Sequence, residues 1–275
     1  MGFFHIFLRY RLPEILQVFG ICVSWLFFRP EDLDALALGL WALAMLSAIA
    51  SAFWINDYFD FEDDRSNFRK AHAVSKHAVL VPGLLSLLLS LGLAPLVSVS
   101  LLRTVALVAL ASFLYSAPIF RLKSRIFAPV IVHFFMGVVF FQSASALTGL
   151  SWTGEEVLMA IFWGIILGTG SLGNELVDQA VDERTRIKTV ANTYPGLIRK
   201  IILGFLGLAF LVFVLLMVIE GLAATLILST IVAAVYGMQY LNKSSGWSQE
   251  DYRRHYRVAA VMIILSFHLE LVLRN

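Results

Sequence analysis

The amino-acid sequence predicts an all-α integral membrane protein, with about nine transmembrane helices in a single bundle. Of its 275 residues, 59% are hydrophobic and 15% are charged, and the mean hydropathy is +0.82. A soluble domain carries roughly 45–50% apolar and about 25% charged residues. The apolar residues also form long runs with few breaks, which favours membrane helices over the alternating strands of a closed barrel.

Nine segments are apolar enough to cross a bilayer, for which a helix needs about 20 residues. The third and fourth are separated only by Arg103, and the seventh and eighth only by Glu220-Gly221, which predicts two tight hairpins. No linker or low-complexity tract divides the chain, so we expect one domain over residues 1–275. In order, the segments cover residues 14–29, 33–55, 78–100, 103–120, 125–149, 156–176, 198–219, 221–241 and 255–273.

The basic residues are divided unevenly between the two sides of the membrane. If the N-terminus is cytoplasmic, 18 of the 21 Lys and Arg residues fall on that side, and only Arg29, Arg103 and Arg274 fall outside. Cytoplasmic loops of membrane proteins carry an excess of Lys and Arg. We therefore expect a cytoplasmic N-terminus and an external C-terminus. The cytoplasmic loops would cover residues 56–77, 121–125, 177–197 and 242–254.

Two acidic segments lie at the cytoplasmic ends of the second and sixth expected helices. They read "NDYFDFEDD" at 56–64 and "GNELVDQAVDERTRIKT" at 173–189. If each helix continues, its acidic side chains fall on one face, within about 100° in the first segment and about 60° in the second. Divalent cations such as Mg²⁺ prefer oxygen ligands and would offset the mutual repulsion. The expected metal ligands are Asn56, Asp57, Asp60, Asp64, Glu175, Asp178 and Asp182.

The loop after the fourth expected helix helps to distinguish the alternatives. Solvated loop charges would explain either acidic segment alone, and a cation-coupled transporter also places acidic helices side by side. In "LYSAPIFRLKSR", Pro118 ends the helix, and Arg121, Lys123 and Arg125 follow. These fixed positive charges would not help a cation to pass, whereas Arg and Lys side chains bind phosphate oxygens. An anchor to lipid headgroups would explain the basic loop by itself. Together with the acidic segments, the loop indicates a diphosphate on an isoprenoid tail, bridged by metal ions.

Three motifs in this order resemble those of the UbiA superfamily of intramembrane prenyltransferases. "NDYFDFEDD" fits the first motif, NDxxDxxxD. "ELVDQAVD" resembles the second, with Asp178 and Asp182 as DxxxD and Glu175 in place of a frequent upstream Asp. "YSAPIFRLKSR" closely resembles the segment YSxPxxRLK. The resemblance implies two Mg²⁺ ions, one at each acidic segment, that hold a prenyl diphosphate from the cytoplasmic side.

The resemblance further implies a Mg²⁺-dependent membrane prenyltransferase that transfers a prenyl group to an aromatic or lipid acceptor. Metal ions and basic side chains would neutralise the departing diphosphate, and exclusion of water would protect the allylic cation. A UbiA-type terpene cyclase, which needs no acceptor, stays open as an alternative. The expected catalytic residues are Asp57, Asp60, Asp64, Asp178, Asp182, Tyr115 and Lys123. The expected diphosphate-binding residues are Asn56, Ser116, Arg121, Lys123 and Lys188.

The sequence departs from the family pattern in the loops that would select the acceptor. Many members that use an aromatic acceptor carry Arg-Pro-Leu shortly after the first motif, whereas this chain reads "RSNFRKAHAVSKHAV". Asn174 and Glu175 change the start of the second motif. His133, within the fifth expected helix, would either contact the acceptor or be hydrogen-bonded inside the bundle. These departures leave the identity of the acceptor open.

Overall fold

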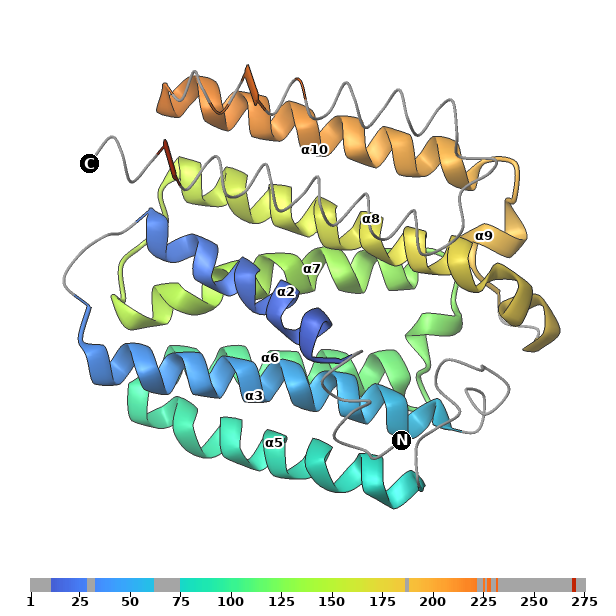
Figure 1. Ribbon diagram of the computed structural model, residues 1–275, viewed down its shortest axis with the longest axis horizontal. Coiled ribbons are helices and arrows are strands. Elements are labelled where there is room, and N and C mark those ends of the chain that lie inside the picture. The colour runs from blue at the N-terminus through green and yellow to red at the C-terminus, as the bar shows by residue number, and fades with distance from the viewer. Residues whose placement is uncertain are drawn as a thin grey trace.

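Helices make up nearly all of the computed structural model (Figure 1). The structure describes residues 11–28, 33–61, 75–185 and 188–221, with residues 225, 227, 228, 231, 269 and 270, but not the side chains of 177 and 180–185. In this part of the chain there is no β-strand, which confirms the expected all-α class. The helices are α2 (Leu12–Ser24), η2 (Trp25–Phe27), α3 (Ala35–Phe59), α5 (Lys76–Val97), α6 (Val99–Ser116), η3 (Leu122–Ser124), α7 (Ala128–Gln142), η4 (Ser143–Leu147), α8 (Gly154–Thr185), α9 (Val190–Thr193) and α10 (Ile198–Glu220).

Six of the described helices are long and apolar enough to cross a membrane. They correspond to the second to seventh expected segments, while the first is represented by a shorter apolar helix, Leu12–Phe27. The eighth and ninth expected segments lie almost entirely outside the described residues. Large apolar side chains on the outer face of α5, such as Leu85 and Leu88, are exposed, as expected where a helix faces lipid. The six spans begin and end at Ala35–Phe59, Lys76–Val97, Val99–Ser116, Ala128–Leu147, Gly154–Leu176 and Ile198–Glu220.

The turn between α5 and α6 lies at Ser98, so the expected boundary at Arg103 is wrong. The backbone of Ser98 is extended, and its N–H donates to the carbonyl of Ala94 at 3.1 Å. Its side chain accepts from the N–H of Leu101 at 3.1 Å, so one residue ends α5 and begins α6. Serine is a preferred N-cap, whereas arginine has a high helix propensity and continues the helix. The expected end of the seventh segment at Glu220-Gly221 is confirmed, because α10 ends at Glu220 and Gly221 is left-handed (φ 66°). The hairpin that would follow it stays a prediction.

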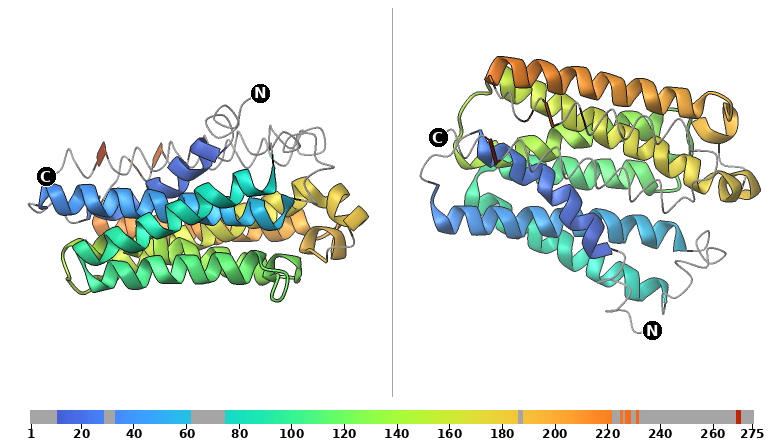
Figure 2. Two further views of the ribbon diagram at one scale, coloured as in Figure 1. Left: turned by 90° about the horizontal axis from the view of Figure 1, so that it is seen from below. Right: turned by 45° about the horizontal axis from the view of Figure 1, so that its top comes forward.

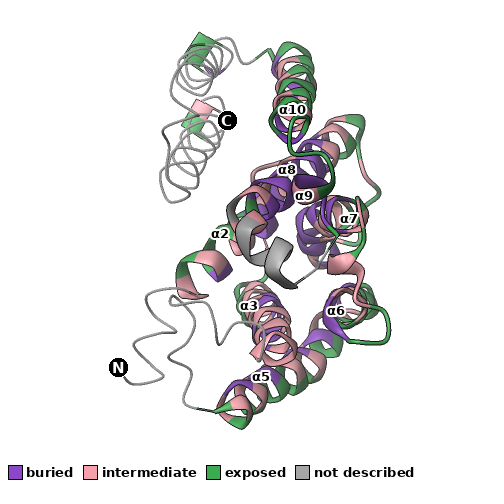
Figure 3. Cartoon of the chain, turned by 90° about the vertical axis from the view of Figure 1, so that its right-hand side faces the viewer, coloured by how far each residue is buried: buried purple, intermediate pink, exposed green. Residues whose placement is uncertain are grey.

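The long helices alternate in direction along the chain. As a result, the carboxyl ends of α3, α6 and α8 lie at the same end of the bundle, together with the amino ends of α5, α7 and α10 (Figure 1). We call this end the polar end, since it carries both acidic segments and the basic loop. Figure 2 shows that α2 crosses obliquely over α3, with its amino end directed toward the polar end. Figure 3, viewed from the polar end, shows α2, α3, α6, α7 and α8 arranged around one centre.

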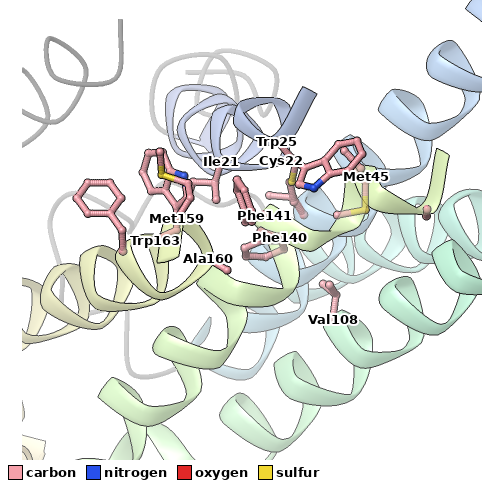
Figure 4. Packing of buried hydrophobic residues seen from close by; sticks show 14 of the residues in the cluster. Ile21, Cys22, Trp25, Met45, Val108, Phe140, Phe141, Met159, Ala160 and Trp163 are labelled. Carbon is pink, nitrogen blue, oxygen red and sulfur yellow. The ribbon is translucent and has the colours of Figure 1, made fainter. Parts of the chain in front are cut away.

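A buried apolar cluster holds α2, α3, α7 and α8 together. Figure 4 shows Cys22 and Trp25 of the first helix packed with Met45 of α3 and Phe141 of α7. These four side chains are at most 1% exposed. Between membrane helices such packing stabilises through close van der Waals contact, because lipid tails are as apolar as these side chains. The cluster therefore fixes the helices whose ends carry the polar residues.

Two glycines allow α7 and α8 to approach closely. A Cβ atom on Gly137 would lie 2.5 Å from the carbonyl oxygen of Trp163, and one on Gly164 would lie 2.9 Å from the ring of Phe134. Real Cβ atoms do not approach other atoms so closely, so only glycine fits at these two positions without displacing backbone. This close contact sets the position of α8, which carries the second acidic segment at and beyond the end of its membrane-spanning part.

Candidate active site

The first acidic segment begins on the last turn of α3. The helix ends at Phe59, and Asp60 is its C-cap, with its N–H donating to the carbonyl of Asn56 at 3.0 Å. Asn56, Asp57 and Asp60 therefore lie together at one helix end, although α3 stops at Phe59 and does not continue to residue 64 as the spacing argument assumed. Asp64 lies outside the described residues, so its position on the same face stays a prediction.

The end of α6 lies against the end of α3. Ser116, which is 2% exposed, donates from Oγ to Oδ1 of Asn56 at 2.8 Å. The helix stops here because Ala117 precedes Pro118 and adopts the extended conformation that this sequence favours (φ −64°, ψ 136°). The structure therefore joins the first acidic motif to the segment YSxPxxRLK through a direct side-chain contact.

Tyr115 lies beside Ser116 and meets a histidine of α7. The rings of Tyr115 and His133 pack edge to face with centroids 5.2 Å apart. Nδ1 of His133 lies 2.8 Å from the carbonyl oxygen of Pro129, one turn earlier in α7. His133 is thus hydrogen-bonded within its own helix and supports the ring of Tyr115, a candidate catalytic residue.

The basic loop returns toward α3 through a strained turn. Arg121 is left-handed (φ 38°, ψ 53°), a conformation that costs an L-residue about 1–2 kcal/mol. Its N–H donates to the carbonyl of Ala117 at 2.7 Å, which closes the turn. Beyond this turn, Nζ of Lys123 forms an ion pair with Oδ1 of Asp60, and the two side chains are only 12% and 14% exposed. The basic loop therefore places the positive charge of Lys123 in contact with Asp60 of the first acidic segment.

Arg11 is a further residue of this site, which the sequence does not single out. Its Nε donates to Oδ2 of Asp57 at 2.8 Å, Nη2 pairs with Oδ1 of the same carboxylate, and Nη1 donates to Glu14 at 2.5 Å. The guanidinium also lies 5.4 Å from the ring centroid of Phe53. Burial alone would lower the pKa of Arg11, but Asp57 and Glu14 raise it above its ordinary value, so the side chain stays charged. In the sequence, Arg11 is merely one of several basic residues on the expected cytoplasmic side, with no signal for a partner 46 positions away.

The second acidic segment begins at the end of the membrane-spanning part of α8, which closes at Leu176, so Glu175 lies within the last turn of the span. Glu175 is 6% exposed, and its Oε2 accepts from the N–H of Val190, the first residue of α9, at 2.8 Å. Its other oxygen, Oε1, is buried without a hydrogen bond of good geometry among the described residues, although the amide of Ala191 also lies close to this carboxylate. Asp178 is half-buried one turn further along, and Lys188 is exposed just before α9. Asp182 lies on α8, but its side chain is outside the described part of the structure.

The described residues suit a divalent cation, although no three described His, Cys, Asp or Glu side chains are gathered closely enough to hold one. At the first segment, the carboxylates of Asp57 and Asp60 each already hold a positive side chain. At the second, the buried Oε1 of Glu175 has no hydrogen bond of good geometry in the described structure, and such an oxygen is costly to leave without a partner. Carboxylate and amide oxygens are ligands that Mg²⁺ accepts. Both acidic segments therefore supply ligand atoms of the kind that Mg²⁺ accepts, but the described carboxylates of the first segment are already paired with Arg11 and Lys123.

The comparisons with known proteins identify the family of this chain. A sequence model of the UbiA prenyltransferase family matches residues 18–265. No curated protein matches the chain closely enough to be called a relative.

Several solved structures share the fold over nearly the whole chain. A UbiA homologue from Archaeoglobus fulgidus bound to GPP and Mg²⁺ has a TM-score of 0.72 at 13% sequence identity, covering 95% of this chain and 98% of that one. An apo UbiA homologue from Aeropyrum pernix K1 has a TM-score of 0.70 at 14% identity, covering 94% and 97%. A structure described for digeranylgeranylglyceryl phosphate synthase in membranes has a TM-score of 0.68 at 16% identity, covering 94% of both chains.

Proposed function

This chain belongs to the UbiA prenyltransferase family, and from that premise we propose that it is a Mg²⁺-dependent membrane prenyltransferase. It would transfer a prenyl group from a prenyl diphosphate to an aromatic or lipid acceptor. It is a multi-pass integral membrane protein with six described spans, so the tail of an isoprenoid substrate would lie in the same bilayer. The polar end would face the cytoplasm, in keeping with the distribution of Lys and Arg.

The observation that carries this proposal is the contact of the basic loop with the first acidic segment. Lys123 pairs with Asp60, and Ser116 binds Asn56, so residues from two separate motifs meet at the ends of α3 and α6. A fixed ammonium group on a carboxylate would obstruct a cation-transport pathway, whereas a diphosphate needs both charges close together. The GPP- and DMAPP-bound structures of the Archaeoglobus fulgidus homologue, which also hold Mg²⁺, support a prenyl diphosphate as the donor.

The acidic segments would hold two Mg²⁺ ions through the proposed ligands. These are Asn56, Asp57, Asp60 and Asp64 on the first segment, and Glu175, Asp178 and Asp182 on the second. When bound, the metal ions would neutralise charge on the diphosphate and so assist its departure.

The remaining polar residues of the site would bind and orient the diphosphate. Lys123 and Arg121 would stabilise the negative charge that grows on the leaving oxygen, and a preformed donor at such a place lowers the barrier. Ser116 holds Asn56 in place, while Tyr115 would present its ring to the allylic cation, which aromatic faces attract. Lys188 would contribute from the loop before α9.

Burial of the site keeps water away from the reacting group. The side chains of Lys123 and Asp60 are each less than 15% exposed. An allylic cation formed beside them would meet little solvent, so transfer to an acceptor would compete with hydrolysis. The acceptor itself would be selected by the loops where this chain departs from the family pattern.

An assay with purified protein tests the proposal. The protein is mixed with Mg²⁺ and a panel of prenyl diphosphates, with or without aromatic and lipid acceptors, and release of diphosphate and prenylated product is measured. We expect both products only when donor and acceptor are present together. Release of a cyclised hydrocarbon without an acceptor would instead identify a terpene cyclase. Failure to consume any prenyl diphosphate would contradict the proposal.

A further inference from the structure

The side chain of Arg11, at the start of α2, is surrounded by contacts with three other residues. Two of its nitrogens contact both oxygens of Asp57, a third contacts Glu14, and the ring of Phe53 lies alongside. The side chains of Arg11 and Asp57 are 14% and 17% exposed, so the pair is largely removed from water. A buried pair of this kind is costly to break by removing one partner, because the other charge is then left buried and uncompensated.

Asp57 is also a proposed ligand of the metal ion, so Arg11 and the metal ion would compete for the same carboxylate. Both carboxylates of the described part of the first segment are already neutralised by the chain itself, Asp57 by Arg11 and Asp60 by Lys123. A divalent cation that arrives alone would meet the positive charge of Arg11 at close range. Like charges at such a distance repel strongly where water is scarce.

We propose that Arg11 is a substrate-binding residue, which occupies Asp57 in the resting protein and moves to the diphosphate when a divalent cation replaces it. This inference rests on the proposed function and adds an order of events to it. The planar fork of arginine fits phosphate oxygens as well as it fits a carboxylate. Arg11 can therefore exchange one bidentate partner for another, without its charge being left unpaired.

The exchange makes the two ligands depend on each other. If the metal ion binds alone, it lies close to the positive charge of Arg11 and is repelled. If the diphosphate binds alone, it lies close to the negative charge of Asp57 and is also repelled. When both arrive, the metal takes Asp57 and Arg11 takes phosphate oxygens, so neither Asp57 nor Arg11 is left without a partner. The binding of one ligand should therefore strengthen the binding of the other by the same factor.

Glu14 keeps the guanidinium close to the site during the exchange. It lies three residues after Arg11, within the first turn of α2, and accepts from Nη1 at 2.5 Å. The two nitrogens on Asp57 can leave while this third contact remains. Arg11 thus needs to rotate its side chain rather than cross the site.

Manganese binding by the purified full-length protein tests this inference without relying on turnover. Mn²⁺ accepts oxygen ligands, and its free form is quantified by electron paramagnetic resonance. For the natural sequence we expect weak binding of Mn²⁺ alone, and binding about tenfold tighter after addition of geranyl thiolodiphosphate, an unreactive donor analogue. Equal affinity with and without bound analogue would overturn the proposal, and this measurement needs no variant.

Two substitutions at Arg11 distinguish the effect of its positive charge on binding from the effect of the planar guanidinium group. Arg11→Gln removes the charge, so Mn²⁺ alone should bind about tenfold more tightly than to the natural sequence, and the analogue should add little. Arg11→Lys keeps the charge, so the affinity for Mn²⁺ alone should stay unchanged while the analogue binds more weakly. Lys200→Gln removes an exposed positive charge at the amino end of α10 and should leave Mn²⁺ binding unchanged.

A purely structural role for Arg11 in joining α2 to α3 gives a different result. In that case Arg11→Gln would lower the thermal unfolding temperature without changing the affinity for Mn²⁺, which would overturn the proposal. Direct binding of radiolabelled analogue separates this failure from failure of the proposed function. If the analogue binds but does not affect Mn²⁺, only the role of Arg11 is wrong. If the analogue does not bind, the proposed function itself is wrong.

Discussion

Ser116, the last residue of α6, donates a hydrogen bond of 2.8 Å to Asn56, which lies 60 positions earlier on the last turn of α3. This bond places the amide of Asn56 at the first acidic segment and joins two motifs that are far apart in the sequence. Because Ser116 is buried, water cannot easily replace the hydroxyl if it is removed. The hydrogen bond thus brings the two motifs together in one site.

Ser116→Ala should lower kcat/KM for the prenyl diphosphate by about tenfold, because a lost buried hydrogen bond costs roughly 1–3 kcal/mol. Ser112→Ala is the matched control, since Ser112 donates to the carbonyl of Val108 within its own helix. It should keep nearly full activity. Steady-state kinetics with thermal unfolding in the same detergent measures both effects. Equal activity of the two variants would show that Asn56 needs no support from Ser116.

Lys123→Met should depress consumption of the prenyl diphosphate by about 10²–10³-fold with every acceptor, because loss of one preformed contact to a developing charge has this effect. Arg121→Lys should also be harmful, since an ammonium group cannot reproduce the guanidinium fork. Lys200→Met removes an exposed charge at the same end of the bundle and should have little effect. Donor consumption with two different acceptors checks the prediction. A defect seen with one acceptor only would move this loop to the acceptor site.

Chelation of divalent cations should abolish turnover, and added Mg²⁺ should restore it, because the acidic segments need a cation to bind a diphosphate. Asp60→Ala and Asp178→Ala should each abolish turnover in protein that still purifies in folded form. Asp34→Asn keeps the oxygen that caps α3 at the opposite end of the bundle and should stay active. Full activity of the purified protein in EDTA would refute the metal assignment.

Glu175→Gln should reduce turnover at limiting Mg²⁺ by at least about tenfold, because the amide lacks the charge that attracts the cation. The substitution preserves an oxygen that accepts from Val190 N–H, so the unfolding temperature should change little. Glu155→Gln, at the other end of α8, serves as the control. A Mg²⁺ titration of activity distinguishes the two roles of Glu175. Unchanged Mg²⁺ dependence would mean that Glu175 only holds α9.

Gly137→Ala should destabilise the bundle by about 1–3 kcal/mol, since the new methyl group would overlap the backbone of α8. Gly170→Ala provides the comparison, because a Cβ atom there meets nothing within 4 Å. It should be neutral or slightly stabilising, as alanine favours helices. Thermal unfolding in detergent reports the difference. Equal unfolding temperatures would indicate that α7 and α8 separate without cost.

The fold was predictable wherever a long apolar run meets a strong terminating signal. Pro118 after Ser116 and Gly221 after Glu220 mark the ends of α6 and α10, and the structure places the ends there. The α5–α6 turn was misplaced because Arg103 is the only charge in that region, whereas the capping ability of Ser98 decides the boundary. Charge alone is therefore a weaker marker of a helix end than a capping side chain.

The site was predictable where a motif acts within its own segment, and not where distant segments meet. The spacing of Asn56, Asp57 and Asp60 follows from helix geometry alone. The pairing of Arg11 with Asp57 depends on how α2 crosses α3. The pattern of apolar residues in the sequence does not predict this crossing. The bond from Val190 to Glu175 likewise depends on the return of the chain after α8. Contacts of this kind arise only when the helices pack together, so the sequence of one segment does not predict them.

The two oxygens of Glu175 give the protein a built-in spectroscopic reporter. One oxygen accepts from the amide of Val190, and the other is the buried atom proposed to meet a cation. A cation that withdraws electron density from the carboxylate would weaken it as a hydrogen-bond acceptor. The amide proton of Val190 would then exchange faster with deuterium, and its ¹⁵N chemical shift would move. A single backbone amide could thus follow occupancy of the second acidic segment without any label at the site itself.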